Sequence, residues 1–324
     1  MLRETVKIVF QNSAGTLEHK IRKMVKRQIR RSASMNQYVI VSDATCDLPA
    51  ALTEQLEIVV IPMEFTMSGK VYRHFPDARE MSFHTFYERT KNGEMSVTSQ
   101  INSITYEKYF CPILEQGKDI LYIAFSSGLS GTYQTSRISA DDLMERYPGR
   151  KIVCIDSKCA SVGEGLLVYY AARKKREGLG LEELAQWAER NRDHICHWFT
   201  VDDLNHLKRG GRVSALSAVV GTALGIKPVL HVDKEGKLLP VANVRGRKKS
   251  LEALIDHMVK TCVHPEGQTI FIGHGDDMEA AECLKSLVQE RFAVKEIVIS
   301  DMGPIIGTHT GCGVAALIFI GTEK

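Results

Sequence analysis

The sequence predicts an α/β protein built from two domains, and three observations support this fold class. The 324 residues are enough for two domains of ordinary size. In the first half, short continuous apolar runs alternate with helical stretches, which is typical of a parallel sheet covered on both faces. In the second half a hairpin pattern interrupts that alternation and indicates a mixed sheet with helices on one side. We expect a three-layer domain over residues 36–195 and a two-layer domain over residues 196–324.

Four apolar runs of the first half are expected to form the parallel sheet. They are Tyr38–Val41, Glu57–Met67, Asp119–Phe125 and Arg150–Ile155. A helix is expected over Thr45–Leu56, and further helices separate the later strands. Polar residues follow the strand ends, where the ligands of such sheets bind. Asp43 follows the first strand and fits a helix cap or a turn as well as a ligand contact.

The second domain is expected to begin near residue 195, after helices over Gly163–Arg176 and Leu181–Asn191. Its predicted strands are His197–Val201, Lys227–Val232, Leu238–Val244, Thr269–Gly273, Glu296–Ser300 and Val314–Ile320, and its predicted helices are Ser250–Cys262 and Met278–Phe292. The polar turn at Lys234–Lys237 joins two of these strands and predicts a hairpin.

The composition is that of a globular protein without membrane-spanning helices. The hydrophobic content of 44% and the charged content of 25% are ordinary for a globular protein. The longest apolar runs have about seven residues, far short of the roughly 18 to 20 that a membrane-spanning helix needs, so a cytoplasmic location is expected. The eight cysteines include no C-x-x-C pair, which favours reduced thiols. No metal and no cofactor are expected, although His194, Cys196 and His197 are close in sequence.

The first 35 residues form a basic extension. Residues 1–37 contain nine Lys or Arg against Glu4 and Glu18, a net charge of +7, so the rest of the chain is mildly acidic. Apolar residues recur among these basic ones at helical spacing, which is typical of an arm that lies on a membrane surface or binds nucleic acid. The favoured alternative is that Met35 is the natural start, because a strand opens at Tyr38. No nucleic-acid partner is expected.

Three polar segments are candidates for a ligand site. Thr308–Gly313 places a histidine between two threonines in a glycine-rich turn. Ser126–Thr132 follows a strand and leads into a helix, whose free backbone N–H groups favour an anion. Val97–Gln100 is a third polar turn. We expect the three segments to converge on one ligand.

Familiar catalytic motifs are absent from these segments. The Ser126–Thr132 segment has no Gly-Lys-Ser/Thr ending of a P-loop, and Gly128–Thr132 misses the closing glycine of a nucleophile elbow. Gly273–Met278 lacks the third glycine of a dinucleotide fingerprint. The residues are suited to holding a ligand rather than transforming it. The enzyme alternative is a phosphotransferase or hydrolase that pairs Ser127 with His309.

The ordered set of motifs resembles the DegV family of fatty-acid-binding proteins over residues 38–321. The motifs are Ser42-Asp43, Thr98-Ser99-Gln100, Ser126–Thr132, Arg209-Gly210-Gly211-Arg212, Arg245–Lys249 and Gly307–Gly313. The resemblance implies a DegV-like fold that encloses one long-chain fatty acid in a tunnel between or within its domains. It also implies that the protein is an acyl carrier without catalytic activity of its own, which presents the fatty acid to a bacterial fatty acid kinase for acyl-phosphate formation.

The resemblance also implies particular contacts. The fatty acid carboxylate would contact Thr98 or Ser99, together with Ser127 and His309, and Arg212 would be a further contributor. The basic residues Arg245, Arg247 and Lys248 would dock an acidic kinase surface, or would simply form a solvated helix start. Transient contact with a membrane is compatible with a fatty acid carrier. This chain departs from the family pattern at Ile101, where a proline usually follows the Thr-Ser-Gln segment.

Overall fold

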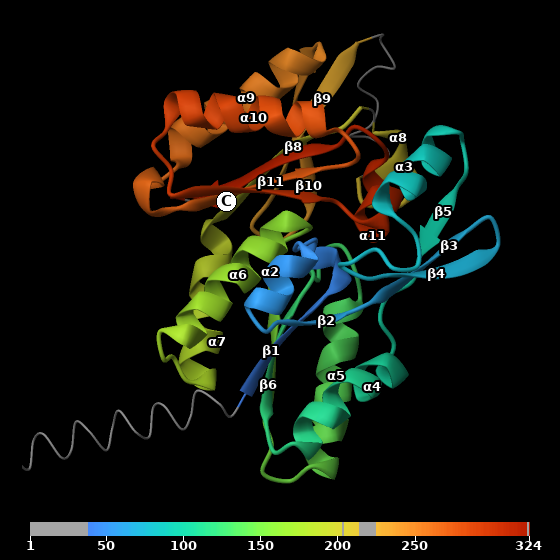
Figure 1. Ribbon diagram of the computed structural model, residues 1–324, viewed down its shortest axis with the longest axis vertical. Helices are drawn as coiled ribbons and strands as arrows, with labels where there is room; N and C mark the ends of the chain where they lie inside the picture. Colours follow the sequence, from blue (N-terminus) through green and yellow to red (C-terminus); the bar gives the residue numbers. More distant parts are fainter. Residues whose placement is uncertain (1–37, 203, 214–224, 323) are drawn as a thin grey trace, which may run out of the picture.

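The computed structural model describes residues 38–202, 204–213, 225–322 and 324. The basic extension of the first 35 residues lies outside the described residues. Within these ranges the strands form three sheets, and the two larger ones lie on opposite sides of helix α6 (Figure 1).

The first large sheet is parallel and has the strand order β2-β1-β6-β7. Its strands are β1 (Tyr38–Asp43), β2 (Val59–Ile61), β6 (Asp119–Ala124) and β7 (Ile152–Asp156). Successive residues of a strand point to opposite faces, so each strand contributes side chains to the hydrophobic core on both sides of the sheet. One face packs against α4 (Ser103–Glu115) and α5 (Thr132–Arg146). The other face packs against α6 (Val162–Arg176) and α7 (Leu181–Asn191), which confirms the three-layer arrangement.

Two predictions for this half are wrong in detail. The expected strand Glu57–Met67 is two strands, because Pro62 has no N–H to donate and separates β2 from β3 (Met63–Met67). The expected helix Thr45–Leu56 is interrupted as well. A short 3₁₀ turn, η1 (Ala44–Cys46), ends at Asp47 in the left-handed conformation, and α2 (Ala50–Gln55) begins only after Pro49.

The extra strand builds a small antiparallel sheet that the sequence analysis did not predict. Its order is β4-β3-β5, with β4 (Lys70–His74) and β5 (Ser96–Thr98) on either side of β3. Helix α3 (Phe83–Lys91) belongs to the same unit and contacts α11 (Pro304–Thr310), which lies far along the chain. This small sheet therefore brings the polar segment at Thr98 beside the polar segment at His309.

The second large sheet is mixed and has the order β10-β9-β8-β13-β11-β12, with β11 and β12 parallel and the other neighbours antiparallel. Its strands are β8 (Ile195–Thr200), β9 (Ile226–Val232), β10 (Leu238–Arg245), β11 (Thr269–His274), β12 (Glu296–Asp301) and β13 (Ala315–Ile320). Its connections contain η2 (Arg192–His194), α8 (Asn205–Arg209), α9 (Arg247–Thr261), η4 (Pro265–Gly267) and α10 (Met278–Arg291). Helices α9 and α10 cover one face, as the sequence predicts.

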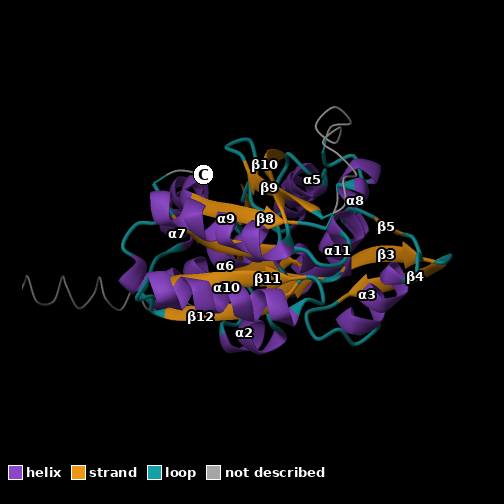
Figure 2. Cartoon of the chain, turned by 90° about the horizontal axis from the view of Figure 1, so that it is seen from above, coloured by secondary structure: helices purple, strands orange, loops and turns teal. Residues whose placement is uncertain are grey.

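Helix α6 joins the two halves. Residues from Val162 to Leu167 are all buried, because one side of α6 packs on β1 and β6 while the other side packs on β8, β11 and β13. A second link is the hairpin of β9 and β10, which forms the edge of the mixed sheet opposite β12 (Figure 2). Its tip accepts a hydrogen bond of 2.7 Å from Ser126 Oγ at the Gly236 carbonyl. The two halves therefore enclose a shared interior.

Candidate functional site

A cavity of about 280 Å³ lies in this shared interior. Its apolar wall comes from both halves of the chain and consists of Met63, Phe125, Leu129, Ala160, Val162, Phe199, Leu207, Val232, Leu238, Met302, Ile305, Ile306, Val314, Ala316 and Ile318. Its polar lining residues are Thr45, Thr98, Ser99, Gln100, Ser130, Ser161, His197, Arg212, His309 and Thr310. Each of the three polar segments contributes to this lining, so the three meet at one cavity.

The geometry of two of these segments differs from the prediction. Thr98 ends strand β5 rather than lying in a turn. Residues 308–310 form the last turn of helix α11, which begins at Pro304, the first helical position, where its missing N–H costs nothing. Gly311 has a positive φ of 74° and ends the helix. The rigid ends of a strand and a helix therefore fix the Thr98 and His309 side chains.

Four of the predicted site residues line one part of the cavity, and we call them the His309 cluster: Thr98, Ser99, Arg212 and His309. The Thr98 hydroxyl lies 2.9 Å from His309 Nε2 and forms a hydrogen bond with it. The other ring nitrogen, His309 Nδ1, is buried and has no hydrogen-bond partner among the described residues. It packs against Gly210, where an added Cβ would lie 2.2 Å from Nδ1. Only glycine fits beside the ring in this position.

Arg212 supplies the positive charge of the His309 cluster. Its Nε donates to the Leu129 carbonyl at 3.2 Å, and its Nη1 donates to the Gly210 carbonyl. No described carboxylate forms an ion pair with it, and burial lowers the pKa of the guanidinium. Burial, followed by the nearby charge of Arg212, also lowers the pKa of His309 to about 4. The ring is therefore neutral at neutral pH, and Arg212 alone carries a charge that an anion can offset.

Ser127 does not line the cavity. Its hydroxyl donates to Asp156 Oδ2 at 2.6 Å, and its backbone N–H donates to Asp156 Oδ1 at 3.1 Å. Among the described contacts no hydrogen bond joins Ser127 to His309, so the pair required by the enzyme alternative is not formed. The neighbouring residues Leu129, Ser130 and Gly131 line the cavity instead.

A second polar group reaches the same cavity through Thr45 and Ser161, and we call it the carboxyl cluster: Asp43, Asp47 and Glu164 with the hydroxyls of Thr45 and Ser161. Thr45 Oγ1 contacts Asp43 Oδ1 and lies 2.9 Å from Glu164 Oε2. A hydroxyl has one proton, so one of these two contacts must be donated by a protonated carboxyl group. Burial is the main cause that raises the pKa of Asp43 and Glu164, which agrees with that assignment.

The third carboxyl of the cluster is also fully bonded. Asp47 Oδ2 accepts from Ser161 Oγ at 2.6 Å, and Oδ1 accepts from the Gly303 N–H at 2.9 Å, next to the start of α11. Asp43 is the only carboxyl group of this cluster that was a candidate from the sequence. Glu164 could have been identified from the sequence as an unusual residue, because it is the only charged residue in the otherwise apolar start of α6. A charge there is compatible with burial only when the group is neutral or hydrogen-bonded.

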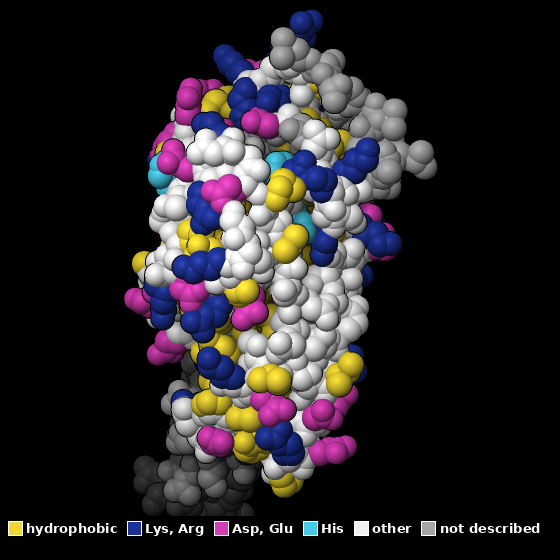
Figure 3. All heavy atoms as spheres, turned by 90° about the vertical axis from the view of Figure 1, so that its right-hand side faces the viewer, with side chains coloured by type: hydrophobic (Ala, Val, Ile, Leu, Met, Phe, Trp, Pro, Cys, Tyr) yellow, Lys and Arg dark blue, Asp and Glu magenta, His cyan; other side chains and the backbone are white. Residues whose placement is uncertain are grey.

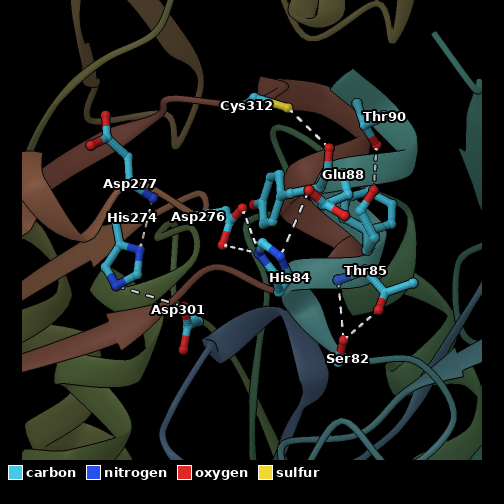
Figure 4. Close-up of polar contacts among 12 residues, drawn as sticks. Ser82, His84, Thr85, Glu88, Thr90, His274, Asp276, Asp277, Asp301 and Cys312 are labelled. Carbon is cyan, nitrogen blue, oxygen red and sulfur yellow. Dashed lines mark hydrogen bonds and ion pairs between the residues drawn. The ribbon is translucent and has the colours of Figure 1, made fainter. Parts of the chain in front are cut away.

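Other titratable groups lie outside the cavity, at the contact between α3 and the second half (Figure 4). His84 Nδ1 lies 3.0 Å from both carboxylate oxygens of Asp276, and this contact raises the pKa of His84. On β11, His274 Nε2 is 3.6 Å from Asp301 Oδ1. The first contact ties α3 to the segment after β11, the second joins the neighbouring strands β11 and β12, and none of the four residues lines the cavity.

The three predicted partner-docking residues lie at the end of β10 and the start of α9. Arg245 is exposed. The Lys248 ammonium is 4.0 Å from Glu252 and its side chain is 81% exposed. Arg247 differs, because its Nη2 donates to Asp277 Oδ2 at 2.6 Å and its side chain is only 26% exposed. Arg245 and Lys248 are thus available to a partner, whereas Arg247 is engaged within the fold.

The described residues contain no group of three or more His, Cys, Asp or Glu side chains that could hold a metal ion. All eight cysteines are free thiols. None of the helices in the described ranges is long and apolar enough to cross a membrane. The face that carries α3 and α8 mixes basic, acidic and apolar side chains (Figure 3).

Solved structures share this fold. A DegV family protein from Thermus thermophilus, whose structure is described as showing fatty acid binding, is 29% identical, with a TM-score of 0.79 and coverage of 88% of this chain and 99% of its own. DegV from Bacillus subtilis, described as a fatty acid binding protein, is 28% identical, with a TM-score of 0.74 and coverage of 88% and 99%.

Sequence comparisons agree with the structural ones. A DegV domain-containing protein of Clostridium perfringens is 42% identical over 290 residues, which are 90% of this chain and 99% of the relative. Another from Streptococcus pyogenes serotype M3 is 34% identical over 287 residues, which are 89% and 99% of the two chains. The model of the DegV family, described as uncharacterised protein, matches residues 37–322. This chain therefore belongs to the DegV family.

Proposed function

We propose that the protein binds one long-chain fatty acid in the cavity, with the carboxylate at the His309 cluster. The observation that carries this proposal is the uneven availability of polar groups along a mostly apolar wall. Arg212 has no carboxylate partner among the described residues, while the oxygens of the carboxyl cluster are already bonded. The fatty-acid-binding relatives support the same ligand class.

The apolar wall accounts for most of the expected affinity. Burying about fifteen methylenes at ~0.8 kcal/mol each gives roughly 12 kcal/mol before ordering costs. The carboxylate then mainly fixes the direction of the chain. Threonine and serine hydroxyls, a neutral imidazole and one guanidinium can hold a carboxylate or an acyl phosphate, since each provides hydrogen-bond donors.

Mass spectrometry of the purified protein tests this proposal. The organic extract would identify the bound acid, and native mass spectrometry of the intact complex would count it. One fatty acid per chain supports the carrier function. A protein that is empty and also fails to take up added fatty acid contradicts it, and turnover of acyl phosphates or esters by the pure protein would favour an enzyme instead.

We also propose that the protein presents the carboxylate to a fatty acid kinase. His309 and Thr98 contact each other at the polar end of the cavity, where a phosphoryl group would be transferred. His309→Ala is expected to leave the fold intact and to reduce acyl-phosphate formation with a cognate kinase and ATP more than it reduces fatty acid binding. Unchanged acyl-phosphate formation would remove His309 from this role.

Docking of the kinase is expected to use Arg245 and Lys248, because both are exposed. Charge reversal of both residues should raise the KM of the kinase for the loaded protein and leave fatty acid binding unchanged. Charge reversal of Lys260, an exposed residue at the other end of α9, is the matched control. Equal effects of the two changes would contradict a specific docking surface.

A further inference from the structure

We propose that His197 closes the end of the cavity remote from His309 and thereby sets the length of the acyl chain. This inference rests on the proposed fatty acid binding and adds a determinant of chain length to it. Three observations support it: the direction in which the cavity runs, the packing of the His197 ring, and the hydrogen bonds that both ring nitrogens make to backbone groups.

Strand β13 gives the direction of the cavity. Val314, Ala316 and Ile318 alternate along the chain, so they share one face of the sheet, and all three line the cavity. Val314 follows the helix that carries His309. At a rise of about 3.3 Å per residue, the four steps from Val314 to Ile318 span roughly 13 Å away from the His309 cluster.

Strand β8 runs alongside and ends at the same place. It is antiparallel to β13, and its register pairs Phe199 with Ala316 and His197 with Ile318. Phe199 and His197 also line the cavity. The pair of His197 and Ile318 therefore lies at the far end, where the terminal methyl group of a fatty acid would arrive.

The His197 ring is fixed against helix α6. The side chain is buried, and a Cβ added at Gly163 would lie 1.9 Å from His197 Nε2, so there is no free space behind the ring. The Ala160 N–H donates to Nε2 at 3.4 Å, and Nδ1 donates to the Ile195 carbonyl at 2.8 Å. Both ring nitrogens are thus occupied by backbone groups.

These contacts define what the ring does. Because its nitrogens are used, His197 offers no hydrogen bond to a ligand and acts as a wall. Because the ring is held on both edges, it cannot rotate away as a flexible Met63 or Met302 side chain on the same wall could. An acyl chain with one methylene too many would have to displace the ring into α6.

The test measures the chain-length preference of His197→Ala. Delipidated protein is mixed with an equimolar set of saturated fatty acids of about 12 to about 20 carbons, and native mass spectrometry reads the bound distribution. The variant should shift the distribution toward longer chains, since each additional buried methylene raises affinity about fourfold. Ile318→Ala enlarges the same end without touching the hydrogen bonds of His197 and should shift the distribution in the same direction.

His231→Ala is the matched control. His231 lies on β9 and stacks on Trp198 with ring centroids 5.0 Å apart, and it does not line the cavity. His231→Ala removes the same imidazole ring as His197→Ala does, and it should leave the distribution of bound chain lengths unchanged. Circular dichroism checks that each variant is folded. If His197→Ala is not folded, the chain-length distribution of Ile318→Ala tests the inference on its own.

The outcomes separate this inference from the proposed function. A wild-type protein that takes up no fatty acid contradicts the proposed function itself. A wild-type protein that is loaded, with a distribution identical to that of the folded His197→Ala or Ile318→Ala variant, overturns the role of His197. A shift of equal size in His231→Ala also overturns it, because the effect would then not come from the cavity end.

Discussion

Two polar regions border the same cavity and differ in what their hydrogen bonds leave free. In the carboxyl cluster, Thr45 bridges Asp43 and Glu164, and Ser161 bonds to Asp47, so the polar atoms satisfy one another. In the His309 cluster, Arg212 contacts two backbone carbonyls but no described carboxylate, so its positive charge is left without an ionic partner among the described residues. Polarity alone does not locate a ligand head group. The head group is located by the hydrogen-bond donors and the charge that have no partner within the described part of the fold.

Replacing Arg212 is the change expected to affect this comparison most. Arg212→Met keeps much of the apolar stem and removes the charge. A hydrogen bond to a charged group is worth about 1.5–3 kcal/mol, so the Kd for a fatty acid should rise roughly 10- to 150-fold, which a fluorescent fatty acid displacement assay would measure. Arg209→Met, on the exposed side of α8, should change little. Equal Kd values for both variants would contradict a head-group role for Arg212.

The pH dependence of stability should also differ between the His309 cluster and the carboxyl cluster. The pKa of His309 is about 4 in the fold and about 6.5 in an unfolded chain. The unfolded chain therefore binds more protons between these values, and the His309 contribution to stability falls as the pH drops from about 6.5 toward 4. Between about pH 7 and pH 5 this loss is roughly 2 kcal/mol.

His309→Gln should remove that share of the pH dependence. Urea denaturation of the wild type and the variant at the two pH values measures it, and the buried His74 and His197 remain in both proteins as an internal reference. Parallel stability curves would show that His309 titrates normally in the fold, against the geometry described here.

The carboxyl cluster should show the opposite sign. Burial raises the pKa of Glu164 in the fold, so the stability linked to its proton is present below the ordinary glutamate range and is lost as pH rises through the raised value. Glu164→Gln has no such proton to lose. Its free energy of unfolding should decline less than that of the wild type from about pH 6 to about pH 9, with fatty acid binding unchanged. Impaired binding in this variant would place the carboxyl cluster in the ligand site.

The smallest effect is expected at Ser127. Because its hydroxyl donates to Asp156 outside the cavity lining, Ser127→Ala should change the Kd for a fatty acid by less than about twofold. Thr98→Val is its counterpart inside the His309 cluster and should weaken binding by about 2- to 12-fold, the range of a neutral hydrogen bond. If Ser127→Ala weakened binding as much as Thr98→Val, Ser127 would belong to the head-group site after all.

Regular elements were predictable where a local pattern determines them. Helix α7 spans Leu181–Asn191 as predicted, because its apolar residues recur at helical spacing. The run Glu57–Met67 forms two strands instead of the expected one, because Pro62 within it is incompatible with a single central strand. The segment at His309 is the end of a helix rather than the expected turn, because Pro304 favours a helix start and the glycines at 311 and 313 come only after the helix has ended.

The site was predictable in part, since the polar segments that converge could be named. Their pairing could not. Thr98 and His309 are 211 positions apart and meet only because the small sheet of β3 to β5 packs against α11. The carboxyl cluster was missed for the same reason, because Thr45 and Glu164 are 119 positions apart. Neither sequence spacing nor residue type indicates which polar side chains the fold will pair.

Helix α6 has a consequence for biogenesis. It is complete at Arg176, before the first residue of the mixed sheet at Ile195 has been translated, and one of its apolar sides packs on β8, β11 and β13. A nascent chain that has reached the middle of the protein exposes this side on the ribosome. The sheet that covers this side can be completed only after β13, its central strand and the last to be synthesised, has left the ribosome.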